Sequence, residues 1–393
     1  GGEIRDFHII KHLLASSTLH FFSLYEDAKD TRSNLLYPYL DRYITAESLD
    51  FYNQLTRKVR RLMRKDYHFH RDANVQIDRA KFLAGNLQQQ LEESQPDFLF
   101  VSPQSNPVAL MLDKSKYNTR FIFATYDVEA VRVKRIAEAT GDVTSQQASL
   151  AEAFERENLA AYDGILAVSE LDKQIFVEKY QFPSERILVI ENSVDLNYFK
   201  FEPRVQREQK NIVYIGSLSY FPNEEAAWRL IERIMPLVRQ KFPDACLWVV
   251  GQGASEKLAA MTDNQYTVVT GKVEDVRPYL AYADLTCVPL MTGSGTKYKI
   301  LEAFSAGVPV VCSSIAAEGL DLGHEVHALI GDSDEELAER VIRMLSDSQM
   351  ADELTRNAYD LVTVQYSWRS NLSKLDQWLA WLAKSPPLTS LEM

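Results

Sequence analysis

Short apolar runs rich in β-branched residues alternate with longer helical patterns along almost the whole chain. Helical patterns such as Glu224–Phe242 and Asp334–Leu345 separate the shorter runs. This alternation predicts an α/β fold with parallel sheets. The predicted strands are Leu19–Leu24, Phe98–Val101, Arg120–Ala124, Gly164–Val168, Ile187–Ile190, Asn211–Ile215, Ala245–Val250, Tyr266–Val269, Leu285–Val288, Val308–Cys312 and Ala328–Ile330.

The predicted strands form two series, separated by a polar stretch at Glu191–Lys210. A chain of 393 residues has room for two domains of ordinary size. We therefore expect two doubly wound, Rossmann-like domains that face each other across a cleft. The first domain takes residues 1–190 and the second takes 211–367, with 191–210 as the linker. The tail Lys384–Leu391 is predicted to be a frayed end.

Both ends of the chain give rise to further expectations. The last helix, near Trp368–Leu382, should cross back so that 368–393 complete the first domain. Its large apolar residues need cover, and they are Trp378, Leu379, Trp381 and Leu382. A Rossmann-like half opens with a strand, a glycine turn and a helix. Here Gly1, Gly2 and the predicted helix Glu3–Leu14 come first, so we expect the opening strand to lie upstream.

The chain is acidic, with a formal net charge of −12 and a pI near 5.2. An acidic surface repels phosphate backbones, so no nucleic acid partner is expected. The cysteines Cys246, Cys287 and Cys312 each lie in or beside a predicted strand. Their number and spacing fit neither a disulfide framework nor a zinc site. We expect buried, reduced thiols and a cytoplasmic protein.

The strongest chemical signal follows the predicted strand Leu285–Val288. A glycine-rich turn consists of Gly293, Ser294, Gly295 and Thr296. A helix is predicted to start at about Thr296. Glycine lets the backbone approach a ligand closely, and the first N–H groups of a helix have no partner inside it. The turn therefore offers hydrogen-bond donors and a positive dipole to an anion, with charge added by Lys297 and Lys299.

Lys299 and Glu302 are three positions apart and share one face of that predicted helix. A carboxylate there can accept hydrogen bonds from both hydroxyls of a ribose. Phosphate donors and a ribose acceptor one turn apart match a nucleoside diphosphate. The alternative is an ordinary strand–turn–helix unit with a lysine–glutamate pair on its surface.

Five stretches of the second half have an order and spacing that match one family. They are IVYIGSLSYFPNEEAAWRLI, LWVVGQG, VVTGKVEDVRPYLAYADLTCVPL, GSGTKYKILEAFSAGVPVVCSSIAAEGLDL and HEVHALIGDSDEELAERV. The first half matches more loosely, through GGEIRDFHIIKHL, FATYDVEAVRVKRIA and DGILAVSELDK. The chain thus resembles the retaining GT-B glycosyltransferases of family 4, the group 1 enzymes of bacterial polysaccharide synthesis.

The resemblance implies roles for individual residues. Glu302 resembles the glutamate that binds the ribose of the donor, and Lys299 resembles a contact to its phosphate and sugar. The catalytic residues are predicted to be Lys299, Glu302 and Asp127. The other implied donor contacts are Gly1, Gly2, Gly216, Ser217, Lys272, Val273, Gly293, Ser294, Gly295, Thr296 and Lys297. No metal or other cofactor is expected.

The sequence departs from the family pattern at two places. Ser294 stands eight residues before Glu302, where many relatives carry a second glutamate. Ser217 follows Gly216, where many relatives carry an arginine. The cations left to replace the missing charge are Lys297, Lys299 and Arg5.

The resemblance implies hexosyl transfer with retention at the anomeric carbon. We expect front-face attack, in which the leaving phosphate helps to deprotonate a glycan or lipid-linked acceptor. UDP-glucose is the first candidate donor, ahead of UDP-N-acetylglucosamine and GDP-mannose. Two rival functions are a UDP-sugar 2-epimerase and a protein that binds a nucleotide sugar without catalysis, which Ser294 favours.

Two acidic patterns can be explained either by a functional role or by stabilisation of the start of a helix. Asp127 follows the strand Arg120–Ala124 and should face the cleft, where it either touches substrate or stabilises the start of a helix. Asp332 and Asp334 have the spacing of a metal-binding pair. The residues Ser333 and Glu336, however, have the spacing of a capping box, which we favour.

A run of positive charge interrupts the acidic chain at Phe51–Lys65. Its apolar residues recur at helical spacing on the opposite side, so an amphipathic helix is predicted. Its polar side is either a solvated face or a docking surface for an anionic lipid or a lipid-diphosphate acceptor, which would hold the protein at the inner face of the membrane. The basic residues are Arg57, Lys58, Arg60, Arg61, Arg64 and Lys65.

Overall fold

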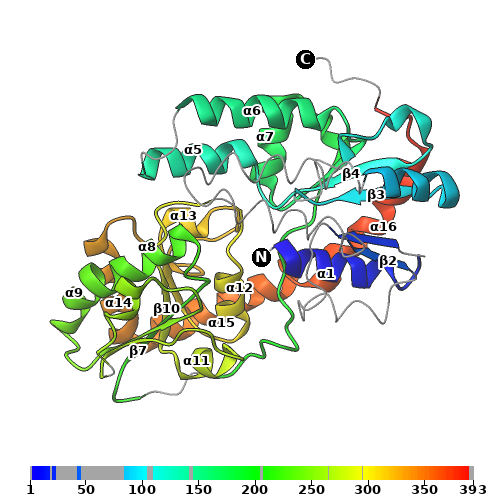
Figure 1. The fold of residues 1–393 in the computed structure, drawn as a ribbon. Coiled ribbons are helices and arrows are strands. Elements are labelled where there is room, and N and C mark those ends of the chain that lie inside the picture. Colours follow the sequence, from blue (N-terminus) through cyan, green and yellow to red (C-terminus); the bar gives the residue numbers. More distant parts are fainter. Residues whose placement is uncertain are drawn as a thin grey trace.

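The computed structural model describes residues 2–17, 20–23, 42–45, 84–103, 109–140, 145–203, 207–263, 265–293 and 295–388. These residues form two α/β domains built on parallel sheets (Figure 1). Gly1, Ser294 and the basic segment Phe51–Lys65 lie outside the described ranges. Within them, no helix is long and apolar enough to cross a membrane.

The first domain holds a four-stranded sheet in the order β3-β4-β5-β6 and a separate parallel pair, β1-β2. The strands are β1 (His20–Ser23), β2 (Arg42–Thr45), β3 (Phe98–Val101), β4 (Arg120–Ala124), β5 (Gly164–Ala167) and β6 (Ile187–Val189). The helices are α1 (Gly2–Leu13), α5 (Glu129–Thr140), α6 (Ser145–Leu159) and α7 (Glu170–Tyr180), with helical residues at 84–94 and short 3-10 turns at Lys114–Lys116 and Ser184–Arg186. The upstream strand and the domain boundaries at 190 and 211 stay predictions.

The second domain holds a six-stranded parallel sheet in the order β12-β11-β10-β7-β8-β9. The strands are β7 (Asn211–Ile215), β8 (Cys246–Val250), β9 (Thr267–Val269), β10 (Leu285–Val288), β11 (Val310–Cys312) and β12 (Leu329–Ile330). The chain winds outward from β7 to β9 and then returns to the other side of β7 with β10. In such sheets, ligands bind outside the carboxyl ends of the strands at the point where the order reverses, here between β7 and β10.

The helices of the second domain are α8 (Phe221–Arg229), η7 (Leu230–Ile234), α9 (Met235–Arg239), α10 (Glu256–Ala259), α11 (Arg277–Tyr282), α12 (Tyr298–Ser305), α13 (Ser314–Ala317), α14 (Asp334–Ser346) and α15 (Ser348–Gln365). The helix predicted at Glu224–Phe242 is therefore wrong as one α-helix, since a π-helical turn interrupts it. Pro236 follows that turn and has no N–H to donate, which favours a local change of helix type.

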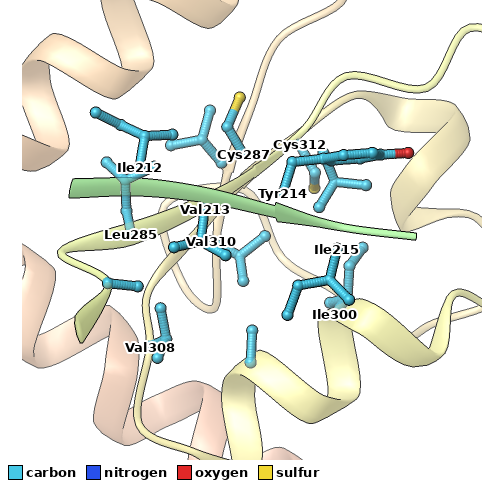
Figure 2. Packing of buried hydrophobic residues seen from close by; sticks show 14 of the residues in the cluster. Ile212, Val213, Tyr214, Ile215, Leu285, Cys287, Ile300, Val308, Val310 and Cys312 are labelled. Atoms are coloured by element: carbon cyan, nitrogen blue, oxygen red, sulfur yellow. The ribbon is translucent and has the colours of Figure 1, made fainter. Parts of the chain in front are cut away.

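The core of the second domain lies on both faces of β7. Ile212 and Tyr214 lie on one side of the strand and Val213 and Ile215 on the other, facing Ile300 of α12 (Figure 2). Successive side chains of a strand alternate between its faces, so a strand apolar throughout is covered on both. The three cysteines are buried and free, as predicted.

The helix α16 (Trp368–Lys384) leaves the second domain and packs on the first beside α1 (Figure 1). This confirms the predicted crossing. Trp378 fits against Gly164 of β5, where a Cβ would lie 2.7 Å from its ring. The expectation that Trp381 needs cover is wrong, because Trp381 is 40% exposed. Its position falls outside the helical stripe that buries Leu375, Trp378, Leu379 and Leu382.

The residues after α16 are tied to the first domain. Leu388 N donates to the buried Asp163 carboxylate at 2.8 Å, and Arg186 donates to Pro386 O at 2.7 Å. The expectation of a frayed end is therefore wrong for 385–388. The tail thus adds hydrogen bonds to two buried charged residues, beside those that Asp163 receives from Phe121 N and Lys114 and that Arg186 donates to Asp163 O.

Candidate functional site

Loops that follow β7, β8 and β9 meet at the carboxyl edge of the second sheet. Gly216 follows β7, and Gly251 follows β8. A Cβ on Gly251 would lie only 1.7 Å from Gly216 O, so a side chain larger than hydrogen cannot fit without displacing the Gly216 loop. Gly251 also pairs with Gly271, which follows β9. These loops are therefore packed backbone against backbone beside the reversal of strand order.

Gly251→Ala is expected to destabilise the protein by about 1–3 kcal/mol, the usual effect of overpacking, and, by displacing Gly216, to weaken the nucleotide binding that the family resemblance implies for this loop. Urea unfolding and calorimetry with UDP would measure both effects. Gly85→Ala is the matched control, because Gly85 is helical and a Cβ there meets no atom within 4 Å. Equal urea midpoints for Gly251→Ala and the parent would contradict the close approach.

Lys299, on α12, turns toward β7. Its Nζ donates to Tyr214 Oη at 2.9 Å and to Asn223 Oδ1 at 2.7 Å, and it lies 4.3 Å from the centre of the Tyr214 ring. A Cβ on Gly216 would lie 2.9 Å from Nζ. The ammonium group therefore sits directly beneath the loop that follows β7. This placement does not match the alternative of a surface lysine–glutamate pair.

Burial in the site shifts the pKa of three ionisable groups toward their neutral forms. Burial lowers the pKa of Lys299 to about 7, with Lys297 adding to the effect and Glu302 opposing it. Burial raises the pKa of Glu302 to about 7, and Lys299 opposes that shift. Burial also lowers the pKa of Lys297 to about 8. A ligand that is anionic and carries hydroxyl donors would restore the charged forms.

The glycine-rich turn contacts the first domain and the segment that follows β6. Gly295 has a φ of +67°, and a Cβ there would lie 3.0 Å from Tyr126 O. Asn192 donates to the Thr296 hydroxyl, and Tyr298 Oη donates to Asn192 Oδ1 at 3.0 Å. The turn is thus held from outside its own domain.

The helix after the turn starts later than predicted. The predicted start at Thr296 is wrong by two residues, because α12 begins at Tyr298 with an extended Lys297 as its N-cap. The hydroxyl of Thr296 is bound by Asn192. The Lys297 ammonium donates to Gly295 O and so lies against the turn.

Asp127 lies where the first domain meets the turn, as expected for a residue that faces the cleft. A Cβ on Gly295 would lie 3.8 Å from the Asp127 Cβ, and the carboxylate lies 3.9 Å from Arg132 Nε. The first N–H groups of α5 donate instead to the buried Glu155, whose carboxylate accepts from Glu129 N at 3.0 Å. Sequence reasoning missed Glu155. Because it already caps α5, the interpretation of Asp127 as a substrate contact is favoured.

Arg5 cannot replace the missing phosphate clamp, so that expectation is wrong. Its side chain is fully buried and fixed by backbone carbonyls at the ends of three strands. The acceptors are Thr125 O at 2.8 Å, Leu166 O and Ala167 O at 3.1 Å and Ile190 O at 3.2 Å. A guanidinium group has five N–H donors in a rigid fork, which suits converging carbonyls as well as phosphate.

Three of the remaining predicted contacts lie in loops at the same edge of the second sheet, and Gly2 lies in the first domain. Ser217 Oγ is 3.0 Å from Ser219 Oγ in the loop after β7. In the loop after β9, Lys272 is exposed and Val273 packs against the core. Gly2 is the first residue of α1.

Sequence reasoning also missed Thr292, immediately before the turn. Its side chain is 5% exposed, and its Oγ1 has no hydrogen-bond partner within the part of the chain that the structure describes. A buried hydroxyl without a partner is unfavourable, so Thr292 is a candidate ligand group. The sequence signal that could have identified Thr292 is its position directly before Gly293.

The acidic pair after β12 has structural partners. Ser333 and Glu336 form the predicted capping box at the start of α14. Asp332 accepts from Ser314 N at 2.8 Å, and Asp334 pairs with Arg229 at 2.7 Å. The favoured explanation of this pattern is thereby confirmed.

Residues 209–347 match the family model of the group 1 glycosyl transferases. These residues form a group 1 glycosyltransferase domain. It contains the reversal of strand order, the glycine-rich turn and the Lys299–Glu302 helix. Among curated proteins, a phosphatidyl-myo-inositol mannosyltransferase of Mycobacterium tuberculosis is 27% identical over 161 residues, which are 39% of this chain and 41% of that protein. The chain spans about half the length of the curated relatives it matches.

Solved structures resemble both domains of the protein together. A sucrose-phosphate synthase from Thermosynechococcus elongatus has a TM-score of 0.71 at 15% identity, and covers 97% of this chain and 93% of its own. HepE from Anabaena, in complex with UDP-glucose, has a TM-score of 0.68 at 14% identity, with 97% and 96% covered. The glycosyltransferase domain thus belongs to a GT-B fold, as predicted.

Proposed function

We propose that the protein transfers a hexosyl unit from a UDP-sugar, with UDP-glucose as the first candidate, to a hydroxyl of a glycan or lipid-linked saccharide. The observation that carries this proposal is the position of Lys299 and Glu302 on the helix behind the glycine-rich turn, at the strand reversal of a group 1 glycosyltransferase domain. The HepE complex with UDP-glucose supports the donor, and the name of the mannosyltransferase supports a lipid acceptor.

The proposed reaction retains the configuration at the anomeric carbon. The acceptor hydroxyl attacks on the face from which the diphosphate leaves, the bond from the anomeric carbon to the phosphate oxygen breaks, and the acceptor proton passes to that oxygen. Negative charge grows on the diphosphate as the bond breaks. The N–H groups at the start of α12, with Lys297 and Lys299, would stabilise it. Since these cations can neutralise the diphosphate, the proposal includes no metal, and turnover is expected to persist in EDTA.

The test begins with UDP, UDP-glucose, UDP-N-acetylglucosamine and GDP-mannose in a thermal-shift assay. A ligand present at about 100 times its dissociation constant stabilises the folded state by about 2.7 kcal/mol. Product analysis with the best donor follows. If no nucleotide or nucleotide sugar shifts the melting temperature, the proposal is wrong. Formation of a 2-epimer without an acceptor would identify a UDP-sugar 2-epimerase instead.

The basic segment Phe51–Lys65 is proposed to dock on anionic membrane. Each basic residue near such a surface contributes about 1 kcal/mol, so reversal of Arg60, Arg61 and Arg64 to Glu should lower vesicle binding at least a hundredfold. Co-sedimentation with anionic vesicles would measure it, with zwitterionic vesicles as the control. Unchanged binding and unchanged acceptor use would favour a solvated face.

A further inference from the structure

Arg135 of α5 reaches from the first domain into the second. Its Nη1 donates to Gly293 O at 3.0 Å and also to the Glu318 carboxylate, while Nη2 donates to Glu318 Oε1 at 2.7 Å. The two side chains are 27% and 23% exposed. Paired parallel bonds between a guanidinium and a carboxylate combine strength with a fixed geometry. Arg135 therefore fixes two points of the other domain at once.

Both of those points belong to segments that surround the glycine-rich turn. Gly293 begins the turn, with a φ of +117°. Glu318 follows α13, and a Cβ on the next residue, Gly319, would lie 2.9 Å from Thr296 Cγ2. Movement of Arg135 would therefore release the start of the turn together with the segment packed behind Thr296.

The same contact lines a small, partly open cavity between the domains. The cavity has a volume of about 20 Å³ and is lined by Arg135, Gly295 and Glu318, together with Ser169 and Asp172 of the first domain. That volume is about one water molecule. The contact therefore borders a space beside the turn that holds about one water molecule.

We propose that Arg135 is a positioning residue for donor transfer, which acts through Gly293 and Glu318 to hold the glycine-rich turn and to keep the first domain closed over it. The proposal rests on the proposed function. Apparent ligand affinity scales with the fraction of protein in the competent state, and closure limits hydrolysis of the donor by excluding water. Loss of Arg135 should weaken donor binding, slow transfer and raise the share of donor hydrolysed.

The experiment uses the full chain with Arg135→Met, Glu318→Gln and the double variant. The Arg135→Met change should lower kcat/KM about tenfold or more, with a lower kcat and a larger hydrolysed share. Glu318→Gln should have a smaller effect, because the bond to Gly293 remains. The double variant should be no worse than Arg135→Met. The Glu318→Gln change disrupts only the Arg135–Glu318 pair, which Arg135→Met has already removed. Arg135→Lys should recover part of the loss.

The matched control is Lys134→Met on the same helix. Lys134 is 70% exposed and pairs with Glu138, also of the first domain, at 3.9 Å. This variant should behave as the parent does. Two results would overturn the proposal. One is additive effects in the double variant. The other is a folded Arg135→Met whose kcat, KM and hydrolysed share of donor all stay within twofold of the parent. If Arg135→Met does not fold, Glu318→Gln decides on the same readouts. A parent that turns over no nucleotide sugar would instead contradict the proposed function.

Discussion

Lys299→Met is expected to make the free protein more stable while removing most of its donor turnover. Burial lowers the pKa of Lys299 from 10.5 to about 7. The unfolded chain keeps its proton up to about pH 10, so burying this lysine opposes folding at neutral pH. Methionine fills a similar volume without charge, and Tyr214 Oη still donates to Asn223 Oδ1 at 2.9 Å. We expect a gain of about 1–3 kcal/mol in the free energy of unfolding at pH 7.

The stability gain of Lys299→Met should depend on pH. Because the folded-state pKa is lowered, the unfolded state binds more protons between about pH 7 and 10.5, and the contribution of Lys299 to stability rises with pH across that window. The advantage of Lys299→Met over the parent should therefore shrink from pH 7 to pH 10. Urea titrations at pH 7, 8, 9 and 10 would measure it. The exposed Lys257→Met, on α10, should show no such trend.

Function should change in the opposite direction. Negative charge on the diphosphate grows in the transition state, so loss of the ammonium group should lower kcat by about 10²–10³-fold. Bound diphosphate favours the protonated lysine, so UDP affinity of the parent should fall as pH rises from 6.5 to 8.5, and that of Lys299→Met should change less. A variant that is less stable than the parent and keeps its turnover would show that Lys299 is a structural lysine.

The strands of the second domain could be predicted closely because they are buried on both faces. A run such as Asn211–Ile215 is buried throughout and apolar after its first residue. The strand β2, RYIT, was missed because it is short and half polar. The predicted helix Glu224–Phe242 is interrupted at Leu230–Ile234, where a π turn precedes Pro236, and hydrophobic periodicity alone does not signal this change of helix type.

The candidate site was predictable only where its residues are close in sequence. Lys299 and Glu302 lie on one turn of helix, so spacing alone places them together. The partners of Arg5 lie more than a hundred positions away along the chain, as do those of Arg135. Nothing in the local sequence distinguishes an arginine that binds carbonyls from one that binds phosphate. Only tertiary contacts separate the two.

Glu302→Gln is expected to weaken UDP binding by about ten- to a hundredfold. Glutamine keeps the shape of the side chain and one acceptor oxygen but loses the charge. Charge-assisted hydrogen bonds contribute about 1.5–3 kcal/mol, which corresponds to that range of dissociation constants. Calorimetry with UDP would measure the loss. The loss should concern the ribose, because the proposed diphosphate contacts lie about one turn earlier on the same helix.

The ligand itself supplies the matched control for this prediction. UDP that lacks the 2′ and 3′ hydroxyls should bind the parent about as weakly as UDP binds Glu302→Gln, and the variant should lose little more with it, because both changes remove the same contact. Folding is separable from binding here. Burial raises the pKa of Glu302 from 4.5 to about 7, so its contribution to stability falls as pH rises from about 4.5 to 7 and stays low above pH 7, and Gln avoids that loss. The contrary result is a Glu302→Gln protein that is at least as stable as the parent at pH 8 and in which the losses of affinity from the variant and from the missing hydroxyls add. Glu302 would then not bind the ribose.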